Sequence, residues 1–238
     1  MIFKISLIAV FAFLLNACDQ NKKENQNQDT PAPAMSEISV TTYQDQGTRI
    51  RAINSDGRVI VNGLLLGDNA QIFSSRGFVA FTENKNGKRL RTFNYKGNEL
   101  HTSAYLLKDD SKIFISDNLI SFTTYNEGLR LYTFTADEAQ INTSADLLDE
   151  EKSKVWIGNK LISFSVNRDG LRLRTFNSDG KIINTGALIL DESQSVKIKE
   201  DTVYFLSKFN SIISLNVVDS NGNYIIDRQP WDENKKLE

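Results

Sequence analysis

A ten-residue stretch occurs three times in this chain in closely related forms. It reads LRLRTFNSDG at 171–180, KRLRTFNYKG at 88–97 and LRLYTFTADE at 129–138. Alignment on these copies defines five units, with leading apolar residues Ile38, Phe78, Leu119, Leu161 and Val203. The units follow one another at spacings of 40, 41, 42 and 42 residues. A unit of this size buries its apolar surface against its neighbours, so the chain is confined to repeat architectures.

Within each unit the pattern is that of short antiparallel strands. The first four units share a block of 30 residues, at 38–67, 78–107, 119–148 and 161–190, and the fifth block fades after Ile226. A strand such as LISFSV at 161–166 precedes a turn rich in Asn, Asp and Gly, a middle strand, a second turn and a third strand such as KIINTGALIL. The connectors between blocks, of 10 to 12 residues, each add a short β-like piece such as KIFIS.

Four short antiparallel strands in about 41 residues are typical of a β-propeller blade. We therefore predict an all-β domain of five antiparallel repeats, arranged as a small, five-bladed β-propeller. A β-trefoil has three units, a parallel solenoid has shorter coils, and an open sheet would expose long edges, so these folds fit less well. Five blocks share only four interior connectors, so one blade lacks a strand unless residues after Ile226 or before Ile38 supply it.

Two rows of apolar residues recur at fixed positions of the middle strand. One row contains Ile53, Phe93, Phe134, Phe176 and Val218. The other contains Ile50, Leu90, Leu131, Leu173 and Leu215. We expect both rows to form the contacts between neighbouring sheets.

The N-terminus has the features of an export signal. Lys4 precedes the apolar run ISLIAVFAFLL, which is too short to span a membrane comfortably, and the only cysteine, Cys18, follows LNA. The stretch LLNAC resembles the lipobox of bacterial lipoproteins. This resemblance implies cleavage before Cys18 and its modification with diacylglyceryl and amide-linked acyl chains such as palmitate. The alternative is ordinary signal cleavage that leaves a free cysteine.

The domain organisation follows from these features. We predict a lipoprotein signal peptide at 1–17, a lipidated Cys18 with a disordered linker at 18–37, a β-repeat domain at 38–232 and a tail at 233–238. The linker is rich in Gln, Asn, Lys and Glu and has nothing to bury. Asp19 resembles the signal that retains lipoproteins at the inner membrane, so we expect the periplasmic side of a bacterial envelope membrane rather than the cell surface.

Few residues suit catalysis, and we expect no cofactor and no metal site. His101 is the only histidine and occupies the repeat position of Asn142 and Asn184, which favours a structural role. No glycine-rich phosphate loop is present. The stretch DSNGN at 219–223 is explained by a hairpin turn better than by a calcium loop.

The arginines are concentrated at two repeat positions of the middle strand. Seven of them lie there: Arg49, Arg51, Arg89, Arg91, Arg130, Arg172 and Arg174. Alternation places both positions on one strand face. The guanidinium groups could bind an anionic ligand, or they could pair with the acids that start the connectors, Asp68, Asp109, Asp149 and Asp191. The same period in these acids favours the second interpretation.

Carboxylates are the remaining catalytic candidates. Glu83, Asp117, Asp146 and Asp201 lie in or beside strands but have no common spacing. We therefore predict a lipid-anchored envelope protein whose domain is non-catalytic and serves protein binding or scaffolding, through a patch that includes Trp156 or Trp231. The alternatives are a lectin-like or anion-binding module and a propeller glycosidase. The net charge of −2 gives no indication of nucleic-acid binding.

Overall fold

The computed structural model describes residues 35–84, 86–167, 169–183, 189, 195–232, 235 and 237. The predicted signal peptide, Cys18 and linker residues 19–34 lie outside the described residues. Within these ranges, no helix has the length and apolar character needed to cross a bilayer.

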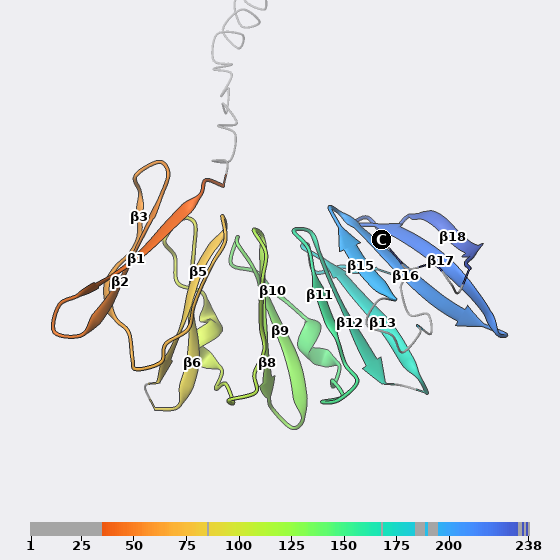
Figure 1. Cartoon of the computed structure of the whole chain (residues 1–238), viewed down its shortest axis with the longest axis horizontal. Helices are drawn as coiled ribbons and strands as arrows, with labels where there is room; N and C mark the ends of the chain where they lie inside the picture. Colours follow the sequence, from red (N-terminus) through yellow and green to blue (C-terminus); the bar gives the residue numbers. More distant parts are fainter. Residues whose placement is uncertain are drawn as a thin grey trace, which may run out of the picture. The chain divides into compact units, whose positions relative to one another are not determined.

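Each repeat forms one antiparallel sheet, and Figure 1 shows the five sheets in chain order. The first contains β1 (Ile38–Gln44), β2 (Thr48–Asn54) and β3 (Val59–Leu65). The second contains β4 (Ile72–Ser74), β5 (Phe78–Asn84) and β6 (Lys88–Asn94). The third contains β7 (Ile113–Ile115), β8 (Leu119–Tyr125), β9 (Leu129–Thr135) and β10 (Gln140–Ile141). The fourth contains β11 (Val155–Ile157), β12 (Leu161–Asn167), β13 (Leu171–Asn177) and β14 (Ile182–Ile183). The fifth contains β15 (Val196–Lys199), β16 (Thr202–Phe209), β17 (Ile212–Asp219) and β18 (Tyr224–Pro230). The predicted all-β, propeller-like fold of five antiparallel repeats is confirmed.

The short strand in each connector belongs to the sheet of the repeat that follows it. β4, β7, β11 and β15 pair with β5, β8, β12 and β16. The first block has no described connector before it, so β1 is the edge of its sheet. The sheet that lacks this strand is therefore the first one.

The third strand predicted for the middle repeats is reduced to isolated bridges in the second sheet and to the two-residue β10 in the third. After β6 and β10 the chain forms the 3-10 helices η1 (His101–Ala104) and η2 (Thr143–Ala145). The hydroxyls of Thr102 and Thr143 donate hydrogen bonds to the carbonyls of Leu90 and Leu131, each at 2.9 Å. These bonds replace the backbone ladder, so the prediction of a continuous third strand is wrong there.

The hydrophobic core lies between successive sheets. Leu90, Leu131 and Leu173 each pack in a cluster with residues of the following sheet. Phe93, Phe134 and Phe176 pack in clusters with residues of the preceding sheet. The two predicted rows thus cover opposite faces of each sheet, because they are three positions apart and residues an odd number of positions apart in a strand point to opposite sides.

Aromatic rings form the same stack in three successive sheets. Phe81 stacks on Phe93, with ring centroids 6.2 Å apart. The corresponding distances are 6.2 Å for Phe122 and Phe134 and 6.0 Å for Phe164 and Phe176. Each pair is a diagonal neighbour across two antiparallel strands, and its burial stabilises both the strand pair and the contact with the preceding sheet.

The fifth repeat differs from the others by one residue in its first hairpin. Asn210 and Ser211, both with positive φ, form a two-residue turn between β16 and β17, where the other repeats have three residues. The strand β16 is therefore shifted by one position relative to the sequence alignment. Phe205, rather than Leu206, occupies the fully buried position of Phe81, Phe122 and Phe164.

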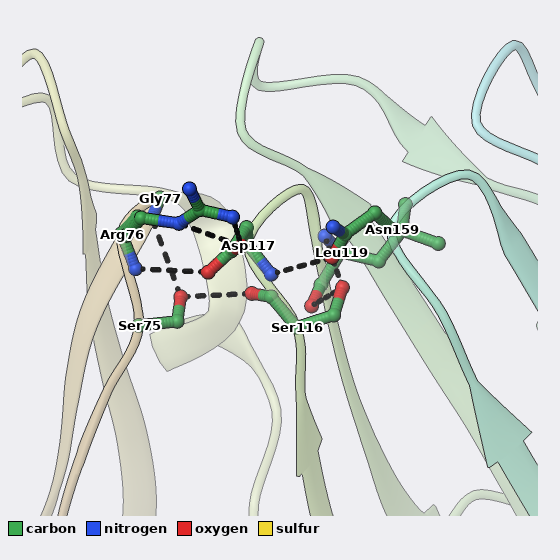
Figure 2. A network of polar contacts seen from close by, with 7 residues as sticks. All are labelled: Ser75, Arg76, Gly77, Ser116, Asp117, Leu119 and Asn159. Carbon is green, nitrogen blue, oxygen red and sulfur yellow. Dashed lines mark hydrogen bonds and ion pairs between the residues drawn. The ribbon is translucent and has the colours of Figure 1, made fainter. Parts of the chain in front are cut away.

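At one end of the sheets, hydrogen bonds connect one repeat with the next, as Figure 2 shows. The Ser75 hydroxyl donates to the Ser116 carbonyl at 2.8 Å, and the Arg76 guanidinium pairs with the Asp117 carboxylate. The Asp117 amide in turn donates to the side-chain carbonyl of Asn159 at 3.1 Å. Three successive sheets are thus joined through equivalent turns, and we call this the network end.

Candidate functional site

The arginines at the earlier of the two repeat positions form the first arginine row, and those at the later position form the second. Members of the first row stabilise the sheets in which they lie. The Nη1 atoms of Arg49, Arg89 and Arg130 donate to the carbonyls of Gly63, Ser103 and Ser144, at 2.5, 2.7 and 2.7 Å. Each acceptor lies 14 residues after its arginine. Arg172 holds the same position in the fourth sheet. The guanidinium groups of Arg49, Arg89 and Arg130 thus fix the third segment of the first three repeats against the middle strand.

In the second row, two arginines lie in ion pairs. Arg91 donates to both carboxylate oxygens of Glu99, at 2.8 and 2.6 Å, and its guanidinium lies 5.3 Å from the centre of the Phe93 ring. The hydrogen bonds that Arg91 donates to Glu99 raise the pKa of Arg91. Arg174 lies 3.3 Å from the Asp146 carboxylate, whereas Arg51 is exposed on the outer face of the first sheet.

The acids that pair with these arginines differ from those predicted. Arg91 and Arg174 contact Glu99 and Asp146, which belong to the third segments of repeats, rather than acids at the starts of connectors. The connector acid Asp149 instead accepts the backbone amides of Glu151 and Lys152, both at 3.1 Å. These bonds lower the pKa of Asp149. Asp191 lies outside the described residues.

The remaining catalytic candidates do not converge on one pocket. The four carboxylates singled out in the sequence each contact a different cation: Glu83 with Arg91, Asp117 with Arg76, Asp146 with Arg174 and Asp201 with Lys160. His101 is exposed at the start of η1. The Asp219 carboxylate accepts amides of its own turn at 2.8 and 2.9 Å, as the hairpin interpretation predicted. No group of three or more metal-ligating side chains occurs in the described ranges.

A cleft lies at the opposite end of the sheets, which we call the connector end. Its volume is about 430 Å³, and residues of the third and fourth sheets line it together with the connectors beside them. Its aromatic and apolar walls include Phe114, Tyr125 and Trp156. Its charged groups include two carboxylates and two ammonium groups, those of Asp110, Glu150, Lys112 and Lys154.

Tyr125 is the centre of the polar contacts in this cleft. Hydrogen bonding to Glu150, burial and the nearby Asp110 raise the pKa of Tyr125 to about 12, so its phenol is a hydrogen-bond donor at neutral pH. Its hydroxyl lies 3.4 Å from the Asp110 carboxylate. The ammonium of Lys108 lies 3.4 Å from the centre of its ring, which is a cation–π contact. The cleft thus presents a ring already held between an anion and a cation.

A second hollow of about 560 Å³ adjoins the cleft and shares Asp110 with it. Asn84 lines this hollow at the repeat position that Tyr125 has in the third sheet. Sequence reasoning identified Trp156 but missed Tyr125. The available signal was the break in the repeat, since the equivalent residues are Gln44, Asn84 and Asn167.

No protein-family model and no curated protein matches the chain. Solved structures with a similar fold include TolB from Acinetobacter baumannii, at 14% sequence identity and a TM-score of 0.32, with 80% of this chain and 50% of that chain covered. A eukaryotic initiation factor has 7% identity and a TM-score of 0.43, with 82% and 52% covered. A nidogen–laminin complex has 13% identity and a TM-score of 0.31, with 82% and 76% covered. The chain spans about half the length of the first two, and likenesses at this level concern the fold alone.

Proposed function

We propose that the chain is a lipid-anchored protein of the bacterial cell envelope, whose non-catalytic repeat domain binds a protein partner in the cleft between the third and fourth sheets. The cleft is the observation that carries this proposal. It combines aromatic walls with carboxylates and ammonium groups of both signs, which suits a polypeptide segment with apolar and charged side chains.

The arrangement of the arginines argues against the anion-binding alternative. The guanidinium groups of Arg49, Arg89 and Arg130 are engaged by backbone carbonyls, and those of Arg91 and Arg174 by carboxylates. An anionic ligand would have to displace these internal partners. A hydrolase of the glycosidase type is also disfavoured, because the four carboxylates considered for it are held in separate ion pairs.

Site-specific photo-crosslinking tests the cleft. A photoreactive phenylalanine analogue at Tyr125 of the full-length protein should give discrete protein adducts in cells of the native host. The matched control is the same analogue at Tyr224, which is 42% exposed on β18 and lies outside the cleft. Adducts of equal pattern at both positions, or none at Tyr125, would contradict a protein partner at this site.

The anchor is tested separately by metabolic labelling. Full-length protein should incorporate radioactive palmitate and fractionate with membranes, whereas Cys18→Ser should do neither. Unlabelled wild-type protein would reject the anchor but would leave the cleft proposal intact, because the crosslink at Tyr125 does not depend on lipidation.

A further inference from the structure

The first sheet lacks a strand that each of the other four sheets has. In the second to fifth sheets, a short edge strand pairs antiparallel with the beginning of the next strand, as Ile113, Phe114 and Ile115 pair with Phe122, Ser121 and Ile120. The equivalent part of β1 is Ser39–Thr41, since Thr41 pairs with Arg51 as Phe122 pairs with Tyr132. In the part of the chain that the structure describes, β1 is the edge of its sheet.

A hydroxyl residue receives the incoming strand in three of these sheets. The hydroxyls of Thr82, Thr123 and Ser165 accept the backbone amides of Gln71, Lys112 and Lys154, at 2.9, 2.8 and 2.9 Å. The amides of the same three residues donate back to the carbonyls of these partners, at 2.9, 2.9 and 3.0 Å. The hydroxyl residue is thus a reciprocal contact point for the edge strand.

Thr42 occupies this position in the first sheet. Its backbone amide is directed to the free edge of β1, by equivalence with Thr82, Thr123 and Ser165. Those three residues are at most 4% exposed, whereas Thr42 is exposed. The first sheet therefore retains the receiving residue for a strand that no described segment supplies.

The side chains of the existing edge strands indicate what the missing strand requires. Their central aromatic residues, Phe73, Phe114 and Trp156, pack in clusters with the following sheet. In the first sheet the corresponding space adjoins Ile38 and Val40, which are only partly buried. A bulky apolar side chain at the centre of an added strand would complete their burial.

The segment before β1 does not fit this place. Residues 19–34 contain no aromatic residue and no Val, Ile, Leu or Met. Met35 packs against the cluster between the second and third sheets and approaches Gly77, at the network end of the second sheet. Trp231, near the other end of the chain, packs on the fifth sheet.

We propose that β1 is a strand-addition site, where an extended segment of a different polypeptide, with a central aromatic residue, pairs antiparallel with Ser39–Thr42. The added strand takes the place that β7 has in the third sheet. Its backbone supplies an amide to the Thr42 hydroxyl and a carbonyl to the Thr42 amide, and its aromatic residue turns toward the second sheet. This proposal concerns an edge remote from the cleft residues and does not depend on the proposed function.

The chain's own β7 provides a probe. A fluorescent peptide with the sequence of residues 108–118, KDDSKIFISDN, should bind the full-length protein saturably in a polarisation titration. Replacing its phenylalanine by serine should weaken binding by at least about tenfold, because the apolar anchor is lost. Amide chemical-shift changes on binding should be centred on Ser39–Thr42.

Two substitutions at the edge decide where the peptide binds. Thr42→Pro removes the outward amide and the hydroxyl, so peptide binding should fall by at least about tenfold. An edge strand tolerates proline where its amide faces solvent, so the thermal transition of this variant should stay near that of the wild type. The backbone amide of Thr41 faces β2, so Thr41→Ala should bind the peptide as the wild type does. The proposal is overturned by an absence of peptide binding or by undiminished binding to Thr42→Pro. It is equally overturned if the protein forms a dimer in solution that Thr42→Pro abolishes, since a second copy then occupies the edge.

Discussion

At the scale of single residues, the close approach of successive sheets is set by small and hydrogen-bonding groups at the network end. Gly77 is the clearest case, because a methyl group added there would lie 1.7 Å from the Asp117 carbonyl oxygen. Gly77 is thus required for contact rather than for a special backbone conformation. The sequence alone gave no reason to distinguish it from the turn glycines.

We predict that Gly77→Ala lowers the free energy of unfolding by about 1–3 kcal/mol, because the second and third sheets must separate locally. Gly67→Ala is the matched control. Its added methyl group would have only the Asn84 amide within reach, at 3.9 Å, so it should be neutral or stabilise by up to about 1 kcal/mol. Urea denaturation monitored by circular dichroism measures both. Equal losses for the two variants would contradict the steric explanation.

The ion pair of Asp117 should contribute to the pH dependence of stability. The hydrogen bond from Arg76 holds the pKa of Asp117 below its ordinary value. A carboxyl whose pKa is lower in the folded state stabilises fully above its unfolded value of about 3.9, and this contribution is lost as the pH falls through the folded value. Asp117→Asn should therefore reduce stability at pH 7, and the difference from the wild type should shrink in acid.

Denaturation curves at neutral and acidic pH test this prediction. Asp68→Asn, at an exposed connector acid, is the control and should leave stability nearly unchanged at both values. Asp149 and Asp219, whose pKa values are also lowered, remain in the Asp117→Asn variant, so some acid sensitivity persists. A loss in Asp117→Asn that is independent of pH would show that the carboxylate charge is not the cause.

At the scale of elements, the sequence predicted the strands that repeat and failed where one repeat departs from the others. Strand positions and core rows followed from period-two alternation and from the recurrence of Leu90 and Phe93. The loss of one residue in the turn at Asn210 and Ser211 was hidden, because Leu206 fits the aligned position as well as Phe205 does. The short third strands were missed because the competing bond is a threonine hydroxyl to a backbone carbonyl, which apolar patterning does not reveal.

The cleft was less predictable than the strands. Tyr125 and Glu150 are distant in sequence, and their contact depends on the path of a connector that has no strict repeat. Trp156 could be identified because it is one of two tryptophans, but its neighbours could not. When a site consists of residues that differ from the repeat pattern, the sequence can indicate these residues one by one but cannot indicate which of them contact each other.

We predict that the stacked rings carry much of the stability of the strand pairs. Phe122 is fully buried and stacks on Phe134 with the ring planes 5° apart. Phe122→Ala should therefore lower the free energy of unfolding by about 3–5 kcal/mol. Ile225→Ala, at a side chain that is 61% exposed, should change it by no more than about 0.5 kcal/mol. Thermal and urea denaturation measure the stability of both variants. A small loss of stability in Phe122→Ala would contradict a major contribution of the stacked rings.

At the scale of the whole molecule, the five sheets follow one another in a row. The outer faces of the first and the fifth sheet differ in what covers them. The outer face of the first sheet bears polar side chains, including the exposed Ser39, Thr41 and Arg51. On the fifth sheet, Trp231 and Leu237 pack over Leu215 and its neighbours. No hydrophobic cluster among the described residues joins the first and fifth sheets. The terminal units of repeat proteins are commonly capped, and here a polar face caps the first sheet and a covering segment caps the fifth.

This arrangement predicts a gradient of local stability along the chain. The third and fourth sheets pack on clusters at both faces, whereas the first packs on a cluster at one face only. In a row of sheets, stability depends on contacts with nearest neighbours, so amides of β8 and β12 should exchange with deuterium more slowly than those of β2. Trp231→Ala should accelerate exchange in β17 and leave β8 nearly unchanged, because the covering segment contacts only the fifth sheet's cluster. Uniform exchange of all five sheets through a single global opening would contradict a row with free ends and would require that the first and fifth sheets stabilise each other directly.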